Sequence, residues 1–137
     1  MPLGSRVVQW DDTSCGPAAV ATLLNVYERP WSRVSLEREA AVSETGVSML
    51  GLIRAFQSHG LEARGLKAGP DGLMRVPRPF IAYLQPEGGH ASGHFVVVET
   101  LRESAFQVFD PTSGSERDWS RDELLTRSRG IVLAVSD

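Results

Sequence analysis

The stretch that most constrains this chain runs from Gln9 to Ala19 and contains Cys15, the only cysteine in the sequence. Polar residues 11–14 precede this cysteine and small apolar residues follow it, so the pattern predicts a loop leading into a helix that begins near Cys15. Pro17 fits the first helical turn, where a missing backbone N–H is tolerated. A thiol at this position faces unpaired N–H groups and the positive end of the helix dipole, which lower its pKa and favour the thiolate.

The composition is that of one globular domain and excludes several classes of function. The 137 residues are 42% apolar and 23% charged, which is ordinary for a soluble fold with a substantial core. A formal net charge of −3 offers no basic surface, so we expect no nucleic-acid partner. No apolar run approaches the roughly 20 residues that span a bilayer. A single cysteine excludes an internal disulfide and a cysteine-based zinc site.

The ends of the chain bear on domain limits and compartment. Residues 1–5 (Met-Pro-Leu-Gly-Ser) resemble the remnant of a cloning site, so we expect a single domain over residues 6–137. No signal-peptide pattern is visible. The compartment therefore stays open between the cytoplasm and, if a signal has been removed, the periplasm or the exterior. No coiled-coil pattern occurs, and we expect a monomer.

The order of the expected elements predicts an α+β fold in which a helical half packs against an antiparallel sheet. Apolar residues at helical spacing come first, and alternating or β-branched runs dominate after Gly60. We expect helices over residues 18–27, 36–41, 48–59 and 121–126, a helical turn over 71–74, and strands over 61–66 (half-buried), 79–84, 94–100, 105–109 and 130–135.

Two residues of the expected sheet are candidates for a site with Cys15. His94 opens a buried strand, and Asp110 ends the next one, so an antiparallel hairpin places both at the same end. A carboxylate that holds one ring nitrogen fixes the tautomer and leaves the other nitrogen to face a nucleophile. Gln9 lies six residues before the thiol and can supply an amide N–H donor to an oxyanion. The four residues together predict acyl-transfer chemistry.

Each candidate also has a structural interpretation when it is taken alone. A single cysteine near a helix start is more often a small buried hydrophobe, and Asp110 before Pro111 is an ordinary turn residue. His90 lies four residues before His94 in a glycine-rich loop, but no third ligand accompanies the two histidines, so we expect no metal site there. The conjunction of Cys15, His94 and Asp110 carries the catalytic hypothesis.

Three blocks of the sequence resemble one known family. Residues 9–18 (Gln-Trp-Asp-Asp-Thr-Ser-Cys-Gly-Pro-Ala), 93–97 (Gly-His-Phe-Val-Val) and 110–114 (Asp-Pro-Thr-Ser-Gly) are similar to the signatures of the bacteriocin-processing, double-glycine leader peptidases. Those papain-like domains are often fused to peptide-exporting ABC transporters. The resemblance covers nearly the whole chain. It implies a papain-like α+β fold with Cys15 as nucleophile, His94 as general base and acid, Asp110 as orienter and Gln9 as oxyanion donor, without metal or cofactor.

The resemblance implies a cysteine endopeptidase that cleaves a peptide or small-protein precursor after a Gly-Gly-type leader, with an export ABC transporter as a partner. This chain departs from the family in carrying Ser14 where many relatives have an acidic residue, and it shows neither a membrane span nor a nucleotide-binding domain. One alternative is a non-catalytic module of the same fold that binds a leader peptide, since some relatives have lost the cysteine. Another is acyl transfer or amide hydrolysis on a small molecule.

Overall fold

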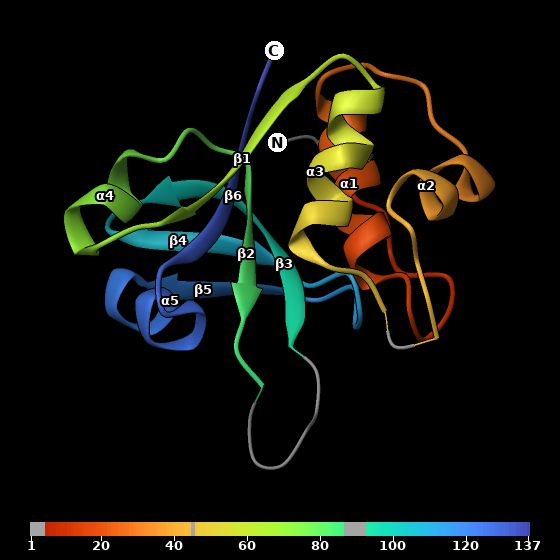
Figure 1. Cartoon of the computed structure of the whole chain (residues 1–137). Coiled ribbons are helices and arrows are strands. Elements are labelled where there is room, and N and C mark those ends of the chain that lie inside the picture. Colours follow the sequence, from red (N-terminus) through yellow and green to blue (C-terminus); the bar gives the residue numbers. More distant parts are fainter. Residues whose placement is uncertain (1–4, 45, 87–92) are drawn as a thin grey trace.

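A six-stranded antiparallel sheet with helices on both faces forms the protein (Figure 1). The structure is a computed structural model, and it describes residues 5–44, 46–86 and 93–137. The strand order in the sheet is β1-β6-β2-β3-β4-β5. The elements along the chain are α1 (Cys15–Val26), α2 (Arg33–Glu39), α3 (Met49–Ser58), β1 (Glu62–Lys67), α4 (Pro70–Arg75), β2 (Phe80–Leu84), β3 (His94–Arg102), β4 (Ala105–Phe109), β5 (Glu116–Ser120), α5 (Arg121–Ser128) and β6 (Ile131–Ser136).

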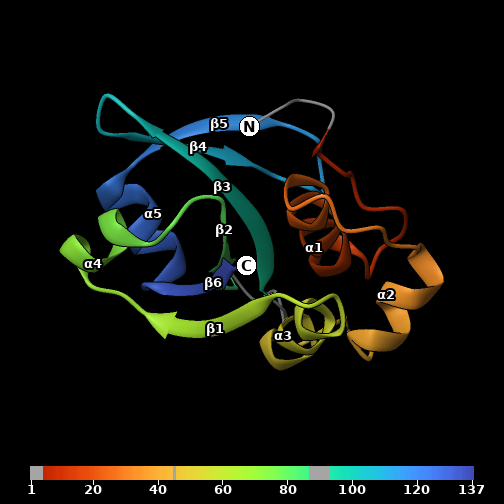
Figure 2. The same cartoon turned by 90° about the horizontal axis from the view of Figure 1, so that it is seen from above.

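Strand β3 lies between two hydrophobic clusters, one on each face of the sheet. Because side chains alternate along a strand, Phe95 and Val97 pack with α1, α2 and α3, whereas Val96 and Val98 pack with α4 and α5. Figure 2 shows the first three helices on one side of the curved sheet and the last two on the other. Burial on both faces explains why this strand is a continuous β-branched and aromatic run.

Helix α1 is buried because small and branched apolar residues cover most of its surface. Its residues from Gly16 to Leu24 are all buried, and the helix packs on β3 and α3. Helix α2 begins three residues before the expected 36–41, because the Ser32 hydroxyl accepts a hydrogen bond from the backbone N–H of Ser35 and caps it. The expected helices at 48–59 and 121–126 are confirmed as α3 and α5, and Ser120 caps α5. The turn at 71–74 is confirmed as α4.

One strand prediction needs correction, and one strand was not predicted. The strand expected at 61–66 is β1, but it is mostly exposed rather than half-buried, because it forms one edge of the sheet and Leu66 is 38% exposed. Strand β5 was not predicted, since four of its five residues are polar or charged and only Trp119 is buried. The remaining strand predictions agree with β2, β3, β4 and β6 to within two residues. Among the described residues, no helix combines the length and apolar character needed to cross a membrane.

Candidate active site

Cys15 is the first residue of α1, as the sequence predicts. The Ser14 hydroxyl organises the loop before it by accepting hydrogen bonds from the backbone N–H groups of Trp10 (2.8 Å) and Asp11 (3.0 Å) and donating to the carbonyl oxygen of Asp11 (3.1 Å). Ser14 is only 1% exposed. An acidic side chain at this position also offers oxygen acceptors to those two N–H groups. The departure of Ser14 from the family pattern therefore keeps a hydrogen-bond acceptor inside the loop.

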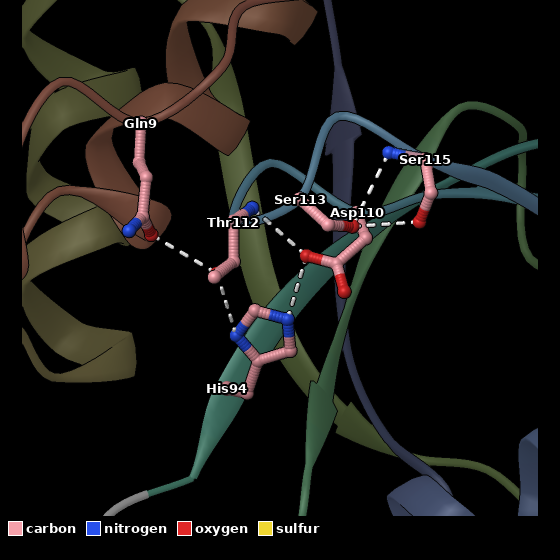
Figure 3. A network of polar contacts seen from close by, with 6 residues as sticks. All are labelled: Gln9, His94, Asp110, Thr112, Ser113 and Ser115. Atoms are coloured by element: carbon pink, nitrogen blue, oxygen red, sulfur yellow. Dashed lines mark hydrogen bonds and ion pairs between the residues drawn. The ribbon is translucent and has the colours of Figure 1, made fainter.

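His94 and Asp110 meet at one end of the β3–β4 hairpin, as predicted. The two strands pair antiparallel, with Val97 opposite Phe109, so the start of β3 and the residues that follow β4 lie at the same end of the hairpin. His94 Nε2 lies 2.8 Å from Asp110 Oδ1 (Figure 3). The same carboxylate oxygen accepts the backbone N–H of Thr112 at 2.8 Å. The backbone of the 110–114 turn thus holds the Asp110 carboxylate, and the carboxylate holds the imidazole of His94.

The environment of Cys15 and His94 favours an ion pair. Burial raises the pKa of the Cys15 thiol, but hydrogen bonds from His94 and the backbone of Phe95 lower it further than burial raises it, so the net pKa is below the ordinary value. Burial lowers the pKa of His94, but its hydrogen bonds with Asp110 and Cys15 outweigh this and raise it to about 9. A lowered thiol pKa beside a raised imidazole pKa favours transfer of the thiol proton to the imidazole, which gives a thiolate–imidazolium pair.

The pKa of Asp110 is lowered, which keeps a negative charge beside the imidazolium. Burial alone raises it, but the hydrogen bond with His94 and the nearby imidazolium charge lower it below the ordinary value. Backbone hydrogen bonds from Thr112 and Ser113 add to the effect. The carboxylate therefore stays ionised where it faces the imidazole.

Gln9 lies in the N-terminal segment, outside any helix or strand, and contacts the site through the 110–114 turn. Its backbone N–H donates to the carbonyl oxygen of Pro111 at 2.8 Å, which places the N-terminal segment beside the 110–114 turn. Its side-chain Oε1 accepts a hydrogen bond from Thr112 Oγ1 at 3.0 Å. Figure 3 shows the amide oxygen directed at Thr112 and the amide nitrogen on the opposite side. The structure thus brings Gln9, His94 and Asp110 together around one turn, and the mutual pKa shifts of Cys15 and His94 indicate that the thiol lies beside the imidazole.

Sequence reasoning missed two features that hold this arrangement. Thr112 lies in the turn between the other residues, and nothing in a turn sequence distinguishes it from an ordinary polar residue. The second is a buried ion pair in which Arg6 Nε and Nη2 contact the Glu99 carboxylate at 2.7 and 2.5 Å. Glu99 directly after the apolar run 95–98 was the available signal, because a charge that follows the buried part of a strand requires a partner.

Among the residues that the structure describes, no group of three or more His, Cys, Asp and Glu side chains could hold a metal ion. His90, considered above with His94 as a two-histidine site, lies outside the described residues.

The comparisons with known proteins agree with the geometry. The model of the peptidase C39 family matches residues 5–137. A probable functional amyloid protease, FapD of Pseudomonas fluorescens, is 36% identical over 139 residues, covering 94% of this chain and 59% of FapD. The chain thus spans less than two thirds of the length of that relative.

Two solved structures share the fold. The peptidase domain of Streptococcus ComA, a bi-functional ABC transporter involved in quorum sensing, superposes with a TM-score of 0.82 at 24% identity, over 95% of this chain and 96% of that one. A double glycine motif protease from an AMS/PCAT transporter, solved with its leader peptide, gives 0.79 at 25% identity, over 94% and 88% of the two chains. The predicted α+β fold, a helical half packed on an antiparallel sheet, is confirmed as the fold of these peptidase domains. The chain belongs to the peptidase C39 family.

Proposed function

We propose that this chain is a cysteine endopeptidase that cleaves a peptide or small-protein precursor after a Gly-Gly-type leader, and that residues 6–137 form its peptidase domain. The observation that carries the proposal is the 2.8 Å contact between His94 and Asp110, together with the position of Cys15 at the N-terminus of a buried helix, where His94 lowers the pKa of its thiol. A structural cysteine needs no polarised imidazole beside it, whereas a nucleophile does.

In the proposed mechanism the Cys15 thiolate attacks the scissile carbonyl carbon. The oxyanion that forms is held by the Gln9 side-chain N–H and the Cys15 backbone N–H, where donors act on charge that develops only in the transition state. His94 then gives its proton to the leaving amine and the C–N bond breaks. A water molecule next loses a proton to His94 and attacks the acyl-enzyme, which releases the acid and restores the thiolate. Asp110 keeps the imidazole in place through both steps.

The choice of substrate rests on the relatives. The double glycine motif protease was solved with a leader peptide, and ComA is a bi-functional ABC transporter. We propose the same class of substrate for this chain, and an export ABC transporter as the partner that carries the released product. Another class of precursor would leave the chemistry at Cys15 unchanged.

The test combines thiol reactivity with cleavage. We expect iodoacetamide to alkylate wild-type Cys15 rapidly below about pH 6, whereas an unperturbed thiol titrates near 8.5, and we expect His94→Ala to abolish that reactivity. A panel of precursor peptides with Gly-Gly leaders should be cut after the second glycine by the wild type. Cys15→Ala serves as the control and should bind the same peptides without cutting them.

The outcomes separate peptidase from binding module. Reactivity at low pH that depends on His94, together with cleavage, supports the proposal. If Cys15 titrates like an ordinary thiol in both wild type and His94→Ala, and the protein binds the peptides without cleaving them, the chain is a leader-binding module and the enzymatic role is refuted.

A further inference from the structure

The Thr112 side chain contacts two of the proposed catalytic residues at once. Its Oγ1 lies 3.0 Å from Gln9 Oε1 and 3.3 Å from His94 Nδ1. Its backbone N–H holds Asp110 Oδ1, the oxygen that also faces His94 Nε2. Figure 3 shows the hydroxyl between the carboxamide and the imidazole. A surface threonine with no role in the site would not need this placement.

The Thr112 hydroxyl has one proton to donate, and the protonation state of the His94 imidazole decides which group accepts that hydrogen bond. With Asp110 at Nε2, an imidazolium also carries a proton on Nδ1 and offers it as a donor. A protonated Nδ1 has no lone pair to accept a hydrogen bond from the Thr112 hydroxyl, which leaves the O–H to donate to Gln9 Oε1. The contact with Gln9 therefore has a defined direction while the resting ion pair is present.

The direction matters because the two ends of a carboxamide have nearly the same shape but opposite electrostatic character. Only the Nε2 end can donate to an oxyanion, and the Oε1 end would repel it. Since Thr112 engages Oε1, the amide nitrogen of Gln9 is left on the opposite side of the group (Figure 3). Without this contact, a rotation of 180° about the last side-chain bond would present the wrong end.

We propose that Thr112 is a positioning residue that fixes the orientation of the Gln9 carboxamide, so that the amide nitrogen rather than the oxygen faces the oxyanion of the reaction. This inference rests on the proposed peptidase function and on Gln9 as the oxyanion donor. Thr112 does not touch the reacting atoms itself. Its effect reaches the transition state through Gln9.

The test compares Thr112→Val, Thr112→Ser and Gln9→Ala with the double variant Thr112→Val/Gln9→Ala, on a Gly-Gly leader peptide. Valine keeps the branched shape and the backbone N–H, and it removes only the hydroxyl. We expect Thr112→Val to lower kcat on the order of tenfold, the effect of one ordinary hydrogen bond, with KM little changed. Thr112→Ser should stay within about threefold of wild type, since it keeps the hydroxyl but loses the rotamer restraint of β-branching. In the Gln9→Ala background the valine substitution should have no further effect.

Thiol alkylation distinguishes an action through Gln9 from an action through His94. Alkylation by iodoacetamide forms no oxyanion, so its pH profile reports the thiolate–imidazolium pair alone. We expect the Thr112→Val profile to match wild type. A shifted profile, a loss of kcat that persists in the Gln9→Ala background, or a fully active Thr112→Val would each overturn the proposal.

A further measurement needs no turnover and so separates this inference from the proposed function. In labelled wild-type protein, the side-chain NH₂ protons of Gln9 should give no strong NOE to the Thr112 methyl group, because Oε1 lies on that side. A strong NOE would place the nitrogen there and refute the inference even in an active enzyme. A wild type that cuts no leader peptide but shows the expected NOE pattern would refute the proposed Gly-Gly leader substrate and leave the orientation supported.

Discussion

Replacing Arg6 by methionine should destabilise the protein far more than loss of an ordinary surface charge. The guanidinium holds Glu99 through two contacts of 2.7 and 2.5 Å, and the Glu99 side chain is only 1% exposed. Arg6 also contacts Glu116 at 3.1 Å, and its guanidinium lies 5.4 Å from the centre of the Phe109 ring. Methionine keeps the length and apolar contact of the stem and removes only the cation.

The magnitude follows from the burial of the remaining carboxylate. Breaking a buried pair by removing one partner leaves an uncompensated charge and typically costs about 3–5 kcal/mol. That is a large part of the roughly 5–15 kcal/mol that stabilises a domain of this size. Glu99→Gln should cost less, about 1–2 kcal/mol, because Arg6 is 16% exposed and keeps Glu116 as a partner. Replacing both residues by methionine should return the free energy of unfolding to within about 1 kcal/mol of wild type.

Urea unfolding followed by tryptophan fluorescence measures these free energies, provided that the slope with denaturant is the same in all variants. The matched control is Arg29→Met. Arg29 lies 2.6 Å from Asp137 in an equally short contact, but the two side chains are 33% and 65% exposed. Its loss should change stability by less than about 1 kcal/mol. If Arg6→Met changes stability as little as the control, or if the effects at Arg6 and Glu99 add, then burial does not decide the strength of this pair and the reasoning is wrong.

Two further predictions concern the ion pair of the site. Asp110→Asn removes a charge but keeps an oxygen acceptor, so the pKa of His94 should fall from about 9. The pH profile of Cys15 alkylation should then move upward by about 1–2 pH units. An unchanged profile would show that Asp110 does not act on the thiolate–imidazolium pair. Folding raises the pKa of His94 from 6.5 to about 9, so the protonated imidazole stabilises the folded protein, fully below pH 6.5 and progressively less as the pH rises to 9. The lowered thiol pKa of Cys15 makes a contribution of the opposite sign, because it stabilises the folded protein at high pH and is lost as the pH falls. The free energy of unfolding in urea should therefore fall less steeply with rising pH over this interval in wild type than in Cys15→Ser. Equal slopes in the two proteins would contradict this.

The parts of the site that sequence could predict are those encoded by local patterns. A polar loop before a small-residue run predicts a helix start, and α1 begins at Cys15. A buried β-branched strand, a short hairpin and a second strand predict that His94 and Asp110 share one end, because antiparallel pairing with a tight turn leaves little freedom in register. In both cases the residues that decide the geometry lie within about 20 positions of each other.

The parts that sequence could not predict depend on contacts between distant segments. Arg6 and Glu99 are 93 positions apart, and Gln9 and Thr112 are 103 apart. Neither pair follows from a periodicity, since each depends on how the N-terminal segment crosses the finished sheet. Strand β5 was missed for a related reason. It is an edge strand, paired only with β4 and buried mainly at Trp119, so its sequence carries almost no alternation.

The N-terminal segment shows why these distant contacts matter for catalysis. Residues 6–9 form no helix or strand, so no ladder of backbone hydrogen bonds fixes the place of Gln9. Three separate attachments do so instead. Arg6 binds Glu99 on β3, the backbone N–H of Val7 donates to Thr22 Oγ1 on α1 at 3.0 Å, and the backbone N–H of Gln9 donates to the carbonyl oxygen of Pro111.

These attachments join the helix that carries the thiol to the hairpin that carries His94 and Asp110. Loss of the Arg6 anchor should therefore affect more than global stability. A residue held by a few side-chain contacts can be displaced while the sheet remains folded, because local opening needs less free energy than unfolding. On this reasoning Gln9 is the member of the site whose position depends most on residues outside it. Thr112 and Arg6 act on the same segment, one by orienting its amide and the other by holding its backbone against the sheet.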